Sequence, residues 1–285
     1  MGLVALAVIL RPGARDTEEV SYQDQSAWMV SRASGEIVRV NGAASDVASR
    51  IPMAERGARL ELVPVGDGAA VLNRDLGELA LIDGVGLEVV TTVAVDDSAD
   101  AQLVSNGEGA YLITRTEVQP ITAEPLDVAE AIDLDAPVTS PVVGSDGTLW
   151  AIERREGVVR AFDAQGATDR FEEDFAPQTS GLAAADGRTL VVDLETAEVT
   201  AVGGGPEPRG CEDELPGGVP VLGYSPTTTA SQDSFVTVSD ADRGSVVVWD
   251  VAQSQCSTID IADAGADLGS AVVEGTTGYV PDYST

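Results

Sequence analysis

The residues of this chain that could do chemistry are mainly carboxylates, because its 285 residues include 48 Asp and Glu but no His and no Lys. Acidic residues form four close groups: Asp96, Asp97 and Asp100; Glu172, Glu173 and Asp174; Glu212, Asp213 and Glu214; Asp240 and Asp242. Two carboxylates about 5 to 9.5 Å apart across a cleft can hydrolyse a glycosidic bond. Since acidic residues are so numerous, the sequence singles out no such pair, and we predict no catalytic residue.

One acidic group resembles the first half of a calcium-binding loop. The segment from Asp240 to Gly244 reads DADRG, but the rest of the ligand set, including the final bidentate Glu, is missing. An Asp pair before Gly is more typical of a hairpin turn, in which the side chains bond their own backbone. We therefore predict a turn and no metal site.

The absence of His and Lys excludes several other kinds of site. The chain cannot contain a Ser-His-Asp or Cys-His pair, a His-bound zinc or haem, a Schiff-base lysine or a P-loop lysine. The triplet Gly203 to Gly205 precedes Pro206 and is typical of a linker rather than a phosphate-binding loop. We predict no cofactor.

The net charge of −32 limits the possible partners. This charge repels the phosphate backbone of nucleic acids, and the scattered arginines do not form a basic stripe. The same repulsion disfavours anionic lipid surfaces. We therefore expect no nucleic-acid partner.

A sequence repeat organises the elements that must position these residues. Each copy has an apolar run, a short polar turn and a second, alternating run, which together predict a β-hairpin. The copies are anchored at Trp28, Ala70, Tyr111, Trp150, Leu190, Phe235 and Tyr279, at steps of 39 to 45 residues. Helical spacing is limited to residues 43–57, where Pro52 interrupts it.

This repeat predicts an all-β fold, a β-propeller of six to seven four-stranded blades. An array of separate sandwiches would need about 100 residues per unit. We expect blades near residues 27–66, 67–106, 107–145, 146–185, 186–230 and 231–274, and an incomplete blade at 275–285. Either the last strand pairs with N-terminal residues to close the ring, or the chain is a piece of a longer protein. We favour the second alternative.

Aromatic residues recur at equivalent positions of the copies. They are Trp28, Tyr111, Trp150, Phe235 and Tyr279. Aromatic side chains contribute a large buried area, and those in this set have apolar neighbours two residues away, so we predict that they pack between blades. The alternative is a stacking surface for sugar rings.

The N-terminal residues differ from the repeats. Residues 1–10 are apolar and are followed by a polar stretch at 11–26, so we expect the end of a membrane anchor or signal segment, then a linker, then the propeller at 27–285. The alternative is a buried N-terminal strand. An anchor would place the propeller outside the cytoplasm, at the membrane or secreted.

The chain has only two cysteines, Cys211 and Cys256. In an oxidising exterior, an even pair of distant cysteines is typical of one disulfide, whereas in the cytosol both would be buried thiols. We predict that Cys211 and Cys256 form a disulfide.

Several copies of the repeat resemble sequences of a known protein family. The segments AWMVSRASGEIVRVN, GAAVLNRDLGELALID, GTLWAIERREGVVRAFD and DSFVTVSDADRGSVVVWD are similar to the propeller-like extracytoplasmic region of actinobacterial membrane-anchored proteins that carry fibronectin type III domains. No fibronectin module is visible in this chain. The resemblance implies a scaffold that faces the cell envelope.

These observations predict a non-catalytic β-propeller that binds a protein or a cell-envelope glycan and contacts a membrane only through its N-terminal segment. The main alternative is a propeller lyase or hydrolase that uses carboxylates on a polymeric or small-molecule substrate. A quinone- or metal-dependent dehydrogenase would need a cofactor constellation that the sequence lacks.

Overall fold

A computed structural model describes most of the chain. The described residues are 20–23, 26–41, 46–163, 166–171, 175–176, 180–185, 187–193, 198–202, 221–224, 235–240, 243–265, 272–274 and 277–279. In this part of the chain the regular elements are all β-strands, and there is no helix long and apolar enough to cross a membrane. The expected anchor segment at 1–10 lies outside the described residues.

The chain divides into two compact units. The first, which we call the N-terminal unit, comprises residues 16–137 and 162–167, and the second, the C-terminal unit, includes residues 138–161 and the described residues from 168 onward.

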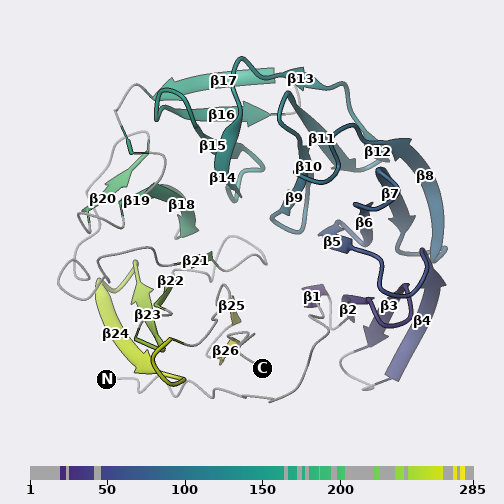
Figure 1. Cartoon of the computed structure of the whole chain (residues 1–285), viewed down its shortest axis with the longest axis horizontal. Helices are drawn as coiled ribbons and strands as arrows, with labels where there is room; N and C mark the ends of the chain where they lie inside the picture. The colour runs from purple at the N-terminus through teal and green to yellow at the C-terminus, as the bar shows by residue number, and fades with distance from the viewer. Residues whose placement is uncertain are drawn as a thin grey trace. The chain divides into compact units, whose positions relative to one another are not determined.

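Three sheets of antiparallel strands lie between residues 20 and 133, within the N-terminal unit (Figure 1). The first sheet has the order β1 (Val20–Gln23), β2 (Ser26–Ser31), β3 (Glu36–Asn41), β4 (Asp46–Pro52). The second has the order β5 (Leu60–Val65), β6 (Gly68–Asn73), β7 (Glu78–Asp83), β8 (Glu88–Ala94). In the third, β9 (Gln102–Ser105), β10 (Ala110–Ile113), β11 (Glu117–Ala123) and β12 (Leu126–Val128) pair in turn, and β13 (Ile132–Asp133) also pairs with β11.

Four further sheets follow along the chain. The fourth has the order β14 (Val138–Val143), β15 (Leu149–Glu153), β16 (Val159–Asp163), β17 (Gly166–Phe171), and the fifth β18 (Ser180–Ala185), β19 (Arg188–Asp193), β20 (Glu198–Ala201). The sixth has the order β21 (Val221–Tyr224), β22 (Phe235–Asp240), β23 (Ser245–Asp250), β24 (Gln255–Asp260), and the seventh pairs β25 (Val272–Glu274) with β26 (Thr277–Tyr279).

The one segment with helical spacing is not helical. Residues 46–52 of the expected 43–57 segment form strand β4, which pairs with β3. The weak helical spacing does not produce a helix because cross-strand pairing outweighs it, in keeping with the predicted all-β fold.

Every repeat anchor lies on the second strand of a sheet, for example Trp28 on β2 and Ala70 on β6. The sheets therefore begin one strand earlier than the expected blades. The segment Leu60–Val65, which the repeat placed at the end of the first blade, pairs with β6 of the second sheet. The hairpin between the second and third strands carries the visible pattern, whereas the first strand follows a longer connection.

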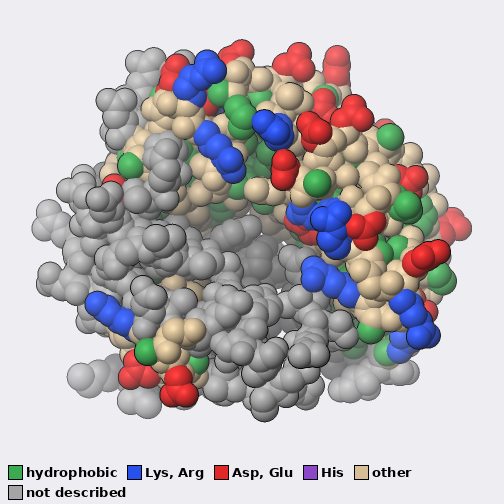
Figure 2. All heavy atoms as spheres, viewed as in Figure 1, with side chains coloured by type: hydrophobic (Ala, Val, Ile, Leu, Met, Phe, Trp, Pro, Cys, Tyr) green, Lys and Arg blue, Asp and Glu red, His purple; other side chains and the backbone are tan. Residues whose placement is uncertain are grey.

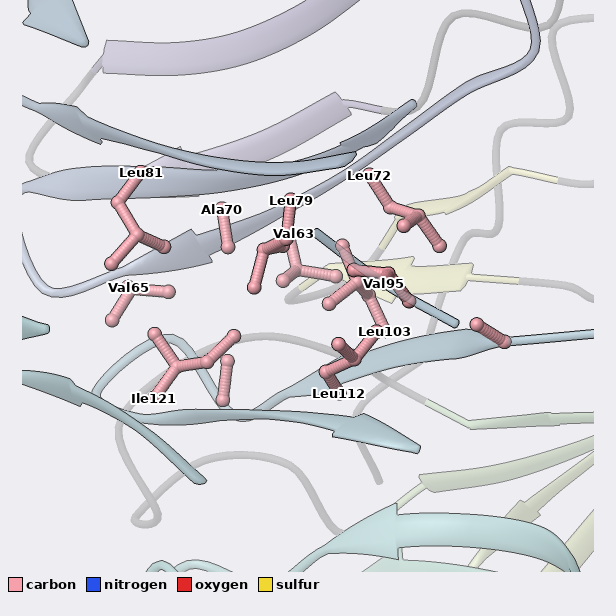
Figure 3. Packing of buried hydrophobic residues seen from close by; sticks show 12 residues of the cluster. Val63, Val65, Ala70, Leu72, Leu79, Leu81, Val95, Leu103, Leu112 and Ile121 are labelled. Atoms are coloured by element: carbon pink, nitrogen blue, oxygen red, sulfur yellow. The ribbon is translucent and has the colours of Figure 1, made fainter. Parts of the chain in front are cut away.

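The apolar cores lie between successive sheets rather than inside one. Figure 3 shows Leu81 and Val65 of the second sheet directed toward Ile121 of the third, and all three are buried. Trp28 of the first sheet belongs to a similar cluster with residues of the second. The second sheet thus shares its two buried faces with the first and the third sheets.

A glycine ends the turn between the second and third strands in several sheets. Gly35, Gly77, Gly157 and Gly244 have φ between 67° and 72°, a left-handed conformation that favours glycine. Their carbonyls accept N–H groups just after the fourth strand, such as the Val95 N–H on Gly77 at 2.8 Å. The turn glycine therefore fastens the outermost strand to the middle of its own sheet.

Candidate functional site

The acidic groups do not form a site in the described structure. Asp96, Asp97 and Asp100 lie in the connection between β8 and β9, where the Asp100 N–H donates to the Asp97 carbonyl at 3.1 Å. The groups at 172–174 and 212–214 lie outside the described residues. Among the residues that are described, no three His, Cys, Asp or Glu side chains gather closely enough to hold a metal ion.

The segment that resembles part of a calcium loop closes a β-hairpin. Asp240 at the end of β22 pairs with Ser245 at the start of β23, and the Gly244 carbonyl accepts the N–H groups of Ile261 and Ala262 at 2.9 and 3.0 Å. The predicted turn is therefore present, and Asp242 lies outside the described residues.

Arg74 and Glu61 form an ion pair in the N-terminal unit. Their side chains are 22% and 21% exposed, and a guanidinium nitrogen lies 2.5 Å from Oε2 of Glu61. Oε1 of Glu61 accepts the Leu103 N–H at 3.1 Å, and Arg74 donates to the Ala99 carbonyl at 2.8 Å. Both charged groups are thus engaged in fastening the second sheet to the start of the third, which is a structural role.

Arg59 and Asp75 form a second pair near the same turn. Nε of Arg59 lies 2.7 Å from Oδ1 of Asp75, and the backbone N–H of Arg59 donates to Oδ2 at 2.9 Å. The backbone N–H, followed by the guanidinium, lowers the pKa of the Asp75 carboxyl below its usual value because both bonds favour the charged form. This carboxylate is exposed and is suited to closing the connection between sheets rather than to proton transfer.

Among the residues that the structure describes, the most buried ion pair joins Glu153 to Arg160 across the hairpin from β15 to β16. The Glu153 side chain is 6% exposed, and Nε of Arg160 lies 2.9 Å from its Oε2. Burial of a carboxylate is tolerated when a guanidinium and hydrogen bonds compensate its charge. The described carboxylates that are buried or half-buried in ion pairs therefore hold turns and hairpins together.

The predicted packing aromatics are placed as follows. Trp28 and Tyr111 are buried, and Trp150 is half-buried against a cluster formed by the fourth and fifth sheets. Phe235 is half-buried on β22, and the side chain of Tyr279 lies outside the described residues. Burial of Trp28 and Tyr111 leaves neither ring available as a sugar-stacking surface.

The predicted disulfide involves one described residue. Cys256 lies on β24 directly opposite Trp249 of β23 and packs against the cluster that contains this tryptophan. Cys211 lies outside the described residues, so the pairing of the two cysteines stays a prediction.

An apolar surface on the second sheet is the most distinctive feature that the sequence analysis did not single out. The described large hydrophobic residues that are exposed are Val47, Leu76, Val85, Val89 and Val90. Four of them belong to the second sheet and its turns, and Val89 and Val90 lie on β8, its outermost strand. We call the span Val85 to Ala94 the β8 edge.

Two other outer strands differ from β8: β4 carries two charged residues, and β24 has fewer apolar residues. Strand β4 contains Arg50 and ends at Pro52, and β24 has the sequence QCSTID. Strand β8 reads EVVTTVA and contains a single charged residue, Glu88. Charged residues and proline on edge strands normally prevent association with other chains. In the sequence, the feature that could have identified the β8 edge is the low number of charged residues and the absence of proline in this outer strand.

Comparisons with known proteins bear on the fold. Neither a protein-family model nor a curated protein matches the sequence. A solved structure of virginiamycin B lyase from Staphylococcus aureus with quinupristin is similar over 96% of this chain and 94% of its own, with a TM-score of 0.65 and 11% identity.

Two other solved structures are also similar. A streptogramin B lyase matches over 91% of this chain and 88% of its own, with a TM-score of 0.60 and 11% identity. BamB from Moraxella catarrhalis matches over 92% and 81%, with a TM-score of 0.51 and 16% identity. At these identities the likeness concerns the fold alone. The repeated antiparallel sheets, the cores between sheets and these similarities confirm the predicted fold class: the chain is an all-β protein with the β-propeller fold.

Proposed function

We propose that this chain is a non-catalytic β-propeller that binds a protein partner at the extracytoplasmic side of the cell envelope. The observation that carries the proposal is the β8 edge, because exposed apolar side chains on an unprotected outer strand are typical of a protein-binding surface. Loops and edges on a rigid β scaffold are common sites of partner recognition.

The absence of histidine argues against the alternative of a lyase. One similar structure is described as a virginiamycin B lyase made catalytically inactive by a histidine-to-alanine substitution. This chain has no histidine at any position, so it cannot supply the group that the lyase loses in that variant.

The exposed surface favours a protein partner over a glycan. Glycan recognition usually needs exposed aromatic rings, whereas among the described aromatic residues Trp28 and Tyr111 are buried and Trp150 and Phe235 are half-buried. Exposed valines and an outer strand suit a polypeptide partner better than a sugar.

Two measurements on the full chain test this proposal. Tagged chain is incubated with native envelope extract, with and without a large excess of untagged chain, and retained proteins are identified by mass spectrometry. We expect at least one protein to be retained and then displaced by the untagged chain. Incubation with quinupristin, with a streptogramin B lyase as the positive control, should leave the antibiotic intact. Consumption of quinupristin, or the absence of any displaced protein, would contradict the proposal.

A further inference from the structure

We propose that the β8 edge binds an extended, positively charged segment of the partner by strand addition, an inference that rests on the proposed function and specifies its binding mode. In this mode an incoming strand pairs its backbone with an outer strand, and side-chain contacts supply the specificity.

The backbone of β8 is available for such pairing. Strand β8 ends the order of the second sheet, and β7 is its one neighbour among the described strands (Figure 1). Residues Thr91 to Ala94 pair regularly with β7, which leaves the opposite edge of the same four residues facing outward. An outward row of N–H and C=O groups is a template for another strand.

The side chains of β8 suit an apolar contact. Val89 is 41% exposed and Val90 is 47% exposed, and Val85 in the preceding turn is 83% exposed. The register shift in the pairing of β7 with β8 leaves Val90 without a partner on β7, as in a β-bulge. Val93 on the same strand packs into the core and holds β8 in place. The strand is therefore anchored on one side and apolar on the other.

The charge around β8 selects a cationic occupant. Glu88 is exposed at the start of the strand, and Asp96, Asp97 and Asp100 are exposed just beyond its end. Two arginines reach the ends of β8, Arg39 at the Gly84 carbonyl and Arg74 at the Ser98 and Ala99 carbonyls. The four exposed acidic residues outnumber them and leave a net negative charge around the strand. Figure 2 shows acidic side chains along the border of the view where Figure 1 places β8.

A second copy of this chain fits the β8 edge less well. An antiparallel pair of β8 strands would bring together two acidic surroundings on molecules that each carry a net charge of −32. Like charges at an interface suppress association, whereas a basic strand gains from both acidic ends. The test must therefore distinguish dimerisation of this chain from binding of a basic segment.

The test uses the full chain and three capped nonapeptides. In the first, valine alternates with lysine; in the second, valine alternates with glutamate; the third is the lysine peptide with methylated backbone amides. Binding is measured by fluorescence anisotropy, and the site by hydrogen–deuterium exchange. We expect the lysine peptide to bind and to slow exchange in residues 88–94, and the other two to bind at least about tenfold more weakly.

Matched variants separate strand addition from general attraction to an acidic protein. Val90→Lys and Thr92→Lys each add one positive charge on β8, and Ser257→Lys adds the same charge at an exposed position of β24. We expect about tenfold weaker binding for the two β8 variants and little change for Ser257→Lys. Val90→Thr, which keeps an uncharged branched side chain but loses apolar surface, should weaken binding less than Val90→Lys. Circular dichroism and melting temperatures confirm that each variant is folded.

The outcomes are distinct. Equal weakening by all three lysine variants, protection outside residues 88–94, or equal binding of the methylated peptide would overturn the inference. Dimerisation of the chain that Val90→Lys abolishes, without binding of the lysine peptide, would assign the β8 edge to a second copy instead. Failure of the peptide test together with a protein displaced in the envelope experiment would reject strand addition but leave the proposed function standing.

Discussion

The guanidinium of Arg39 lies over the ring of Trp28, with its central carbon 5.3 Å from the ring centre. Arg39 also donates to the carbonyl of Gly84, in the turn between β7 and β8 of the next sheet. One arginine therefore covers the buried tryptophan of the first sheet and fastens that sheet to the second. The contact combines a cation–π interaction with a bond to backbone.

Replacement of Arg39 by Ala should lower the free energy of unfolding by about 1 to 2 kcal/mol, because both the ring contact and the bond to Gly84 are lost. Arg39→Lys keeps the charge but not the planar group, and should fall between the parent and Arg39→Ala. Urea unfolding followed by tryptophan fluorescence measures the difference. Equal stability of the parent and Arg39→Ala would show that the contact contributes nothing.

The turn glycines should be sensitive to a single methyl group. A Cβ at Gly35 would lie 2.2 Å from the Ala54 carbonyl oxygen, and the residue has φ +72°. Gly35→Ala must therefore displace backbone as well as adopt a strained conformation, and we expect a loss of more than about 2 kcal/mol. Gly57 has φ +82° but open space around its Cβ position, so Gly57→Ala should cost about 1 kcal/mol. Thermal unfolding of both variants gives the comparison, which fails if the two losses are equal.

The buried carboxylate of Glu153 should depend on its arginine. Arg160→Ala leaves this charge without the guanidinium that lies 2.9 Å away, so unfolding should become easier by about 3 to 5 kcal/mol. The double variant Glu153→Leu with Arg160→Leu removes both charges and should recover much of the stability. Arg50→Ala, which breaks an exposed pair with Glu36, should cost less than about 1 kcal/mol. Chemical denaturation of the four proteins tests the order, and a similar loss in Arg160→Ala and Arg50→Ala would contradict it.

Asp75 predicts a pH dependence with a defined sign. Its pKa is lowered in the folded chain by the Arg59 backbone N–H and guanidinium, so the folded state holds the proton less readily than the unfolded state. The stabilisation is therefore complete above the unfolded pKa and is lost as the pH falls below about 4, through the folded pKa. Carboxyl NMR should give Asp75 a lower titration midpoint than an unfolded reference, and Arg59→Gln should raise that midpoint. An unchanged midpoint in Arg59→Gln would remove the guanidinium as a cause and leave the Arg59 backbone N–H alone.

The predicted disulfide between Cys211 and Cys256 can be tested by counting free thiols. Denatured protein purified from an oxidising compartment should react with no alkylating reagent until it is reduced, after which Cys211 and Cys256 should both be modified. Reduction should also destabilise the fold by about 3 to 4 kcal/mol, because a long loop is no longer closed in the unfolded state. Mass spectrometry counts the modified thiols, and two reactive thiols before reduction would show that the bond is absent.

The sequence by itself determined the repeat and, through it, the fold class. The apolar runs anchored at residues such as Trp28 and Trp150 alternate with Gly-containing turns, and this local pattern predicts hairpins because strand periodicity and turn chemistry are read from neighbouring residues. The composition also excluded every kind of site that needs a histidine or a lysine, since the chain contains neither residue.

Only the tertiary structure decided which strands share a sheet and which surfaces remain exposed. The repeat assigned Leu60–Val65 to the first blade, whereas pairing places it in the second sheet, because the partner of a first strand depends on contacts across a connection of variable length. In the same way, EVVTTVA is a plausible buried strand by composition, and its position as the outermost strand of its sheet is what leaves Val89 and Val90 exposed. Local sequence encodes strands and turns, but burial is a property of the neighbours that the fold brings together.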